Sequence, residues 1–197
     1  MKKILHLQPI DYYTQRNNPT KPWAACMPTS RVMFYLGNNI IFKNPSDLED
    51  DEFFMKVLSS DDAEIMARSK YPSLALNGIP AYEIHGMYHS YLDSYVVGCR
   101  VSDFKTDLTF DDFIDRIKAG ECIMTSGRFP EAGIDGHAFV VVGMLETAIE
   151  TCLILADPWG DYRTEYKNHQ GYGVTMSKAD FSKHVKPGSQ KWGHVLL

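Results

Sequence analysis

A cysteine, a histidine and an aspartate occur in an order and in settings that could support nucleophilic catalysis. Cys26 lies in the stretch Pro22-Trp-Ala-Ala-Cys-Met-Pro-Thr-Ser30, where a loop is expected to turn into a helix. His137 opens an apolar, β-branched run, and Asp157 follows a second such run about twenty residues later. A thiol, an imidazole and a carboxylate placed in this way are the parts of a cysteine-nucleophile hydrolase.

Each of these groups would have a distinct role. A neutral thiol is a poor nucleophile at pH 7, and a helix N-terminus beside an imidazole activates it. Pro28 fits the first turn of a helix that begins at Cys26. His137 would act as the base and later protonate the leaving group, while Asp157 would orient the ring. The backbone N–H of Cys26 and the side-chain amide of Gln15 are the candidate donors to an oxyanion.

Each residue also has a purely structural interpretation. A lone cysteine at a helix start is usually a small buried hydrophobe, and His137 could serve as a turn or capping residue. Asp157 precedes Pro158 and could simply form an Asx-turn. Asp135 competes with Asp157 as the partner of the histidine, but it is expected in the loop before the strand, where it could tune the imidazole without orienting it.

The surrounding pattern predicts an α+β fold. Periodicity predicts a helix from Cys26 to Leu36, and 37–39 supplies its stop. Further helices are predicted to start at Ser46 and Ser60, and within 78–98, 109–120 and 177–184. Strands are predicted at the start of 4–22, at 121–126, 138–144, 152–156 and 192–197, and within 161–176. An N-terminal helical half would then carry the nucleophile, and a C-terminal antiparallel sheet would carry His137 and Asp157.

Composition narrows the function classes. A chain of 197 residues without a linker or repeat is expected to form one domain over 1–197. A formal charge of -5 argues against nucleic acid as a partner. No apolar stretch reaches transmembrane length and no signal-peptide core is present, so we expect a protein that is cytoplasmic when synthesised.

Cysteine spacing points away from a metal site or disulfide framework. The four cysteines show no CxxC pair, so we expect neither zinc nor a cofactor, and we expect Cys99, Cys122 and Cys152 to be buried and inert. His85 and His89 have the i, i+4 spacing of a helical metal pair, but Gly86 between them weakens a helix, and a surface position is the simpler interpretation.

At these residues the chain resembles the C39-like branch of the papain-like cysteine peptidases, of the stand-alone bacterial or bacteriophage type. The matching stretches cover nearly the whole length: 14–19, 26–30, 35–37, 78–80, 136–143, 157–160 and 192–195. The resemblance implies a papain-like fold with Cys26 as nucleophile, His137 as base, Asp157 as orienting acid and Gln15 as oxyanion donor. The chain departs from many relatives at Ala24-Ala25 and Met27-Pro28, which puts the type of substrate in doubt.

The resemblance implies a peptide or protein substrate, cleaved at a peptide or isopeptide bond. Cell-wall peptides are one candidate, and reaching them would require release by lysis or injection. Two alternatives stay open: an acyltransferase that uses the same triad, and a catalytically silent binding module that keeps the fold. The sequence leaves the oligomeric state undetermined.

Overall fold

The computed structural model describes residues 4–19, 21–60, 91–98, 102–106, 108–185 and 192–197. Its α-helices are α1 (Cys26–Gly37), α2 (Asp50–Leu58), α5 (Phe110–Lys118) and α6 (Lys178–His184). Its strands are β1 (Ile4–Leu7), β2 (Ser102–Thr106), β3 (Ile123–Phe129), β4 (Ile134–Glu146), β5 (Thr151–Ala156), β6 (Tyr172–Ser177) and β7 (Trp192–Leu196). Single 3-10 turns are η1 (Gln15–Asn17), η2 (Pro22–Ala24), η3 (Pro130–Ala132) and η4 (Tyr162–Thr164).

The strands form one seven-stranded antiparallel sheet, so the α+β class expected from the sequence is confirmed. The order is β2-β7-β3-β4-β5-β6, and β1 pairs with the end of β4. The long strand β4 is the axis of this sheet, because β3, β5 and β1 all pair with it. His137 lies near the start of β4, so the central strand of the sheet sets its position.

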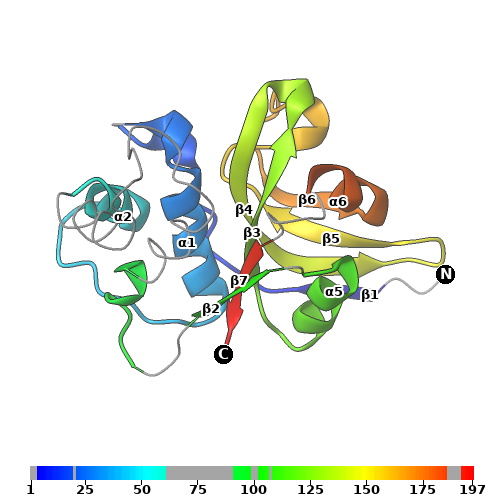
Figure 1. Cartoon of the computed structure of the whole chain (residues 1–197), viewed down its shortest axis with the longest axis horizontal. Coiled ribbons are helices and arrows are strands. Elements are labelled where there is room, and N and C mark those ends of the chain that lie inside the picture. Colours follow the sequence, from blue (N-terminus) through cyan, green and yellow to red (C-terminus); the bar gives the residue numbers. More distant parts are fainter. Residues whose placement is uncertain (1–3, 20, 61–90, 99–101, 107, 186–191) are drawn as a thin grey trace.

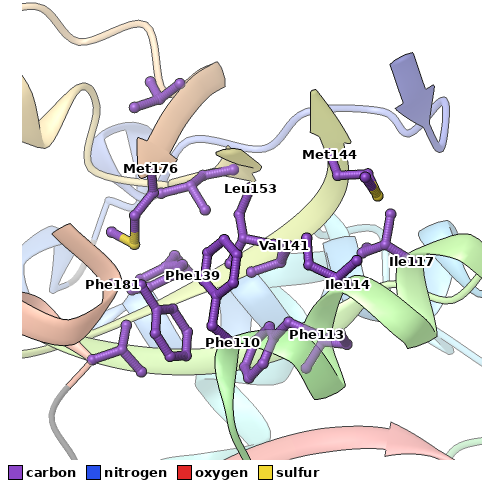
Figure 2. Packing of buried hydrophobic residues seen from close by; sticks show 14 of the residues in the cluster. Phe110, Phe113, Ile114, Ile117, Phe139, Val141, Met144, Leu153, Met176 and Phe181 are labelled. Atoms are coloured by element: carbon purple, nitrogen blue, oxygen red, sulfur yellow. The ribbon is translucent and has the colours of Figure 1, made fainter. Parts of the chain in front are cut away.

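Both faces of the sheet are covered, which explains why β4 and β5 are almost continuously apolar. Phe139 and Val141 of β4 face a cluster with α5 and α6, whereas Val140 and Val142 face a second cluster with α1 and α2. This alternation follows from the two-residue repeat of a strand. Figure 1 shows the two helical layers on opposite sides of the sheet, and Figure 2 shows side chains of α5 and α6 packed on β4 and β5.

Helix α1 occupies the position that its sequence predicts. It begins at Cys26 and ends at Gly37, and its side chains from Val32 to Tyr35 are fully buried between the sheet and α2. The predicted cap at Thr109 is also present: its hydroxyl accepts from the Asp112 N–H, and Asp112 accepts from the Thr109 N–H. Local signals, Pro28 in the first turn of α1 and the Thr109 cap of α5, therefore predicted the starts of these helices correctly.

Three expectations need correction. The helix expected from Ser46 starts at Asp50, because the Ser46 hydroxyl bonds Asn44 and accepts from the Leu48 N–H, which makes a turn. Strand β2 was not expected at all; it pairs antiparallel with β7, and its polar composition suits an edge strand. Because β2 joins the sheet together with β1, which was expected as a strand, the part of the chain before Gly120 is not purely helical.

Some sequence expectations fall on residues that the structure does not describe. These are the helix from Ser60, most of the helix within 78–98, the His85–His89 pair and Cys99. Among the described residues, no helix combines the length and the apolar character that crossing a bilayer requires.

Candidate active site

Cys26 is the first residue of α1, at the end of a helix that faces the sheet. The turn η2 leads into it, and the preceding residue, Ala25, offers no side-chain acceptor to the N–H groups of the first turn. These N–H groups and the helix dipole favour negative charge at this end of the helix. The Cys26 thiol is half-buried, so it is covered yet reachable from outside.

His137 is a residue of the sheet that lines the same cavity as the Cys26 thiol. It lies within β4, opposite Gly127 of β3, and is almost fully buried. Its Nε2 atom lies 2.6 Å from Oδ1 of Asp157, which is fully buried at the end of β5. The imidazole and the Cys26 thiol also interact, and this interaction lowers the pKa of the thiol and raises that of the imidazole. Because Nε2 is committed to Asp157, Nδ1 is the nitrogen that serves the thiol.

Asp157 makes the Asx-turn that was the structural alternative, and it makes the histidine contact as well. Its Oδ1 accepts from the Trp159 N–H at 2.9 Å in addition to His137. Its Oδ2 accepts from the Tyr166 hydroxyl at 3.2 Å. Its backbone carbonyl accepts from the Tyr12 hydroxyl at 2.7 Å. Both interpretations of Asp157 therefore hold together, since the turn fixes the carboxylate that faces the ring.

The charges of the site favour a thiolate and an imidazolium. Burial alone would raise the pKa of the Cys26 thiol, but the hydrogen bond and charge of His137, with the Ala138 N–H, lower it overall. Burial alone would lower the pKa of His137, but the charge and hydrogen bond of Asp157 and the contact with Cys26 raise it to about 10. Lowering the pKa of the thiol and raising that of the imidazole both favour the thiolate–imidazolium pair over the neutral pair.

Gln15 lies beside this pair. It is buried in η1, and its Nε2 donates to the Pro22 carbonyl at 2.6 Å, which leaves one amide hydrogen uncommitted by that bond. Within the described part of the chain, its Oε1 has no hydrogen-bond partner. Of the two polar atoms of this amide, only Nε2 carries hydrogens and can donate to an oxyanion.

A cavity of about 250 Å³ opens onto three of the four predicted residues. Gln15, Cys26 and His137 line it, and Asp157 stands behind the histidine. Its remaining walls are mostly aromatic and apolar: Trp23, Ala132, Ile134, Gly136, Trp159, Glu165 and Tyr166. The structure thus brings together residues that lie up to 142 positions apart in the sequence.

Asp135 does not take part. It lies in β4 and not in a loop as expected, and its exposed side chain (84%) is 3.2 Å from the Arg128 Nε. Of the other cysteines, Cys122 is fully buried and its pKa is raised by burial to about 12. The expectation that Cys152 is buried is wrong, because it is partly exposed like Cys26, although burial and Glu150 still raise its pKa.

Two residues of the site escaped the sequence analysis. Arg16 donates from Nε to the Trp159 carbonyl at 2.7 Å, and its guanidinium stacks 3.9 Å from the Trp159 ring centre. Tyr166 donates to Asp157 from the same loop. No local pattern marks either residue, because both contacts join segments that only the fold brings together. Among the described residues, no three His, Cys, Asp or Glu side chains converge as a metal site would require.

No protein-family model matches this sequence, and no curated protein matches it significantly. The site is therefore interpreted from its own geometry.

Proposed function

We propose that the protein is a cysteine hydrolase that cleaves a peptide or isopeptide bond through Cys26, His137 and Asp157. The observation that carries this proposal is the buried His137 ring, held between a carboxylate and a thiol at the wall of a cavity. A histidine with a purely structural role would not need both partners. Perturbed titratable groups at a cavity are typical of catalytic sites.

In the proposed reaction, the Cys26 thiolate attacks the carbonyl carbon of the substrate and forms a tetrahedral oxyanion. The His137 imidazolium gives its proton to the leaving amine, and the C–N bond breaks to leave a thioester on Cys26. The neutral imidazole then removes a proton from water, which attacks the thioester. The acid product leaves, and the thiolate and imidazolium are restored. Asp157 stays ionised throughout and holds the ring.

The oxyanion would receive hydrogen bonds from two donors. One is the backbone N–H of Cys26, which has no intrahelical acceptor because it is in the first turn of α1. The other is the Gln15 amide, with the hydrogen that Pro22 does not take. The proposal includes a papain-like arrangement of the fold and kinship to the C39-like peptidases. Cell-wall peptides are a candidate substrate.

The first test is the rate at which iodoacetamide labels each cysteine from pH 5 to 9, followed by peptide mass spectrometry. Because the pKa of Cys26 is lowered and that of Cys152 is raised, the rate of Cys26 is expected to reach its plateau at a lower pH than that of Cys152 and to be at least about tenfold higher at pH 7. His137→Ala should abolish this plateau and return Cys26 to an ordinary thiol profile. A wild-type Cys26 that reacts no faster than Cys152 would refute the proposed function.

Gln15→Ala separates oxyanion stabilisation from thiol activation. Alkylation by iodoacetamide forms no oxyanion, so its rate on Cys26 should stay within about twofold of the wild type. Addition of the thiolate to a peptide aldehyde does form one, and the affinity for the aldehyde should fall by about 10²- to 10³-fold. Gln170→Ala, at an exposed position, is the control and should change neither quantity. Equal aldehyde affinities in the wild type and Gln15→Ala would refute the role of Gln15 as an oxyanion donor.

A further inference from the structure

The carboxylate of Asp157 has two oxygens with unequal surroundings. Oδ1 has two partners, His137 and the Trp159 N–H, whereas the hydrogen bond to Oδ2 comes from the Tyr166 hydroxyl. Asp157 is fully buried, so water does not replace a missing donor at Oδ2. A buried anionic oxygen without a hydrogen-bond donor is destabilising, and the Tyr166 hydroxyl supplies this donor to Oδ2.

The backbone around Tyr166 is held in an unusual conformation. Glu165 and Tyr166 are consecutive non-glycine residues with positive φ angles, 54° and 60°. Such residues persist only where the surrounding structure fixes them, and they gather at functional sites. Here the Tyr166 N–H donates to the Asp161 carbonyl, and the Tyr166 carbonyl accepts from Arg16. The result is a ring aimed inward from an exposed loop.

The Tyr166 ring also contacts the histidine. Its plane stands nearly perpendicular to that of His137, at 79°, with ring centres 5.7 Å apart. Burial, and then the charge of Asp157, raises the pKa of the Tyr166 hydroxyl well above its ordinary value, so the group stays a donor over the whole working range. One side chain thus restrains both the carboxylate and the ring that it orients.

We propose that Tyr166 is a positioning residue, which holds Asp157 in the orientation that accepts the hydrogen bond of His137. The inference rests on the proposed function and adds Tyr166 to Cys26, His137, Asp157 and Gln15. Tyr166 acts through Asp157 and makes no bond to the substrate. The charged and titratable groups around Asp157 are His137 of β4, Cys26 of α1, Arg16 and Tyr12 of the N-terminal segment, and Tyr166 itself.

The test is Tyr166→Phe, which keeps the ring and removes only the hydroxyl. Loss of this donor leaves Oδ2 of the buried Asp157 without its hydrogen bond, so the carboxylate holds the His137 imidazolium less firmly and the imidazolium stabilises the Cys26 thiolate less. The midpoint of the Cys26 labelling profile is therefore expected to move to higher pH by about half to one unit. At a pH well below the midpoint, this shift corresponds to roughly three- to tenfold slower labelling.

Tyr162→Phe is the matched control. Tyr162 lies in the same loop and contacts the same Phe129 ring, but its hydroxyl bonds the Thr175 carbonyl and Asp180, away from the site. Its removal is expected to leave the labelling profile unchanged. A second comparison uses Asp157→Asn as the background, in which Tyr166→Phe should cause no further shift because the anion is gone.

The outcomes separate this inference from the proposed function. An ordinary, unactivated wild-type Cys26 would refute the proposed function itself. An activated wild-type Cys26 with an unshifted Tyr166→Phe profile would overturn only the role of Tyr166. Equal shifts in the two Phe variants, or a shift that persists without the Asp157 charge, would also overturn it, because a general loosening of the loop would then explain the result.

Discussion

Replacing Asp157 by alanine is expected to lower the hydrolytic rate of the folded protein by about 10³- to 10⁴-fold. The substitution removes the charge that keeps the buried His137 protonated, so burial then dominates and the pKa of the imidazole falls. It also frees the ring to rotate, because Nε2 loses its acceptor. The pH window of the thiolate–imidazolium pair should narrow, and fast Cys26 labelling below pH 7 should disappear.

Asp135→Ala is the matched control for this prediction. Asp135 lies two residues from His137 in the same strand, but its side chain is exposed and faces Arg128. An exposed ion pair contributes little to the stability of the fold, so both the labelling rate and the activity should stay within about twofold of the wild type. Equal losses in the two variants would contradict the assignment of Asp157 and indicate a general effect of charge near the histidine.

Gly171→Ala is expected to destabilise the protein by about 3 kcal/mol or more. A Cβ atom at this position would overlap the backbone carbonyl oxygen of Asp157 and lie 2.9 Å from the Tyr12 hydroxyl. Backbone atoms cannot move aside as a flexible side chain would. The substitution should therefore push Asp157 away from His137, and both the urea midpoint and the labelling of Cys26 below pH 7 should fall together.

Gly173→Ala distinguishes this steric effect from backbone strain. Gly173 has a φ of 84°, and a Cβ atom there would meet nothing within 4 Å. Alanine at this position costs conformational energy alone, about 1 kcal/mol, and should leave the labelling of Cys26 unchanged. A Gly173→Ala variant as unstable as Gly171→Ala would show that the close approach of Gly171 to Asp157 is not the cause of the loss.

The elements that carry the site were largely predictable because their signals are local. Pro28 after Cys26 marked the start of α1, and apolar runs marked β4 and β5. Strand β2 escaped prediction because an edge strand need not be apolar, so its place depends on pairing with β7. Ser46 was mispredicted for a local reason, because its bonds to Asn44 and Leu48 outweigh its usual preference for starting a helix.

The sequence alone thus determined which residue types could form a thiol–imidazole–carboxylate set, and it preferred Asp157 over Asp135 from their positions around the predicted strands. Only the tertiary structure decided how these groups meet, because hydrogen bonds between distant segments depend on how the sheet closes. Tyr166 reaches Asp157 through a loop whose φ angles no local pattern reveals. The favoured charges of Cys26 and His137 also depend on tertiary structure, because burial and a fixed partner set them together.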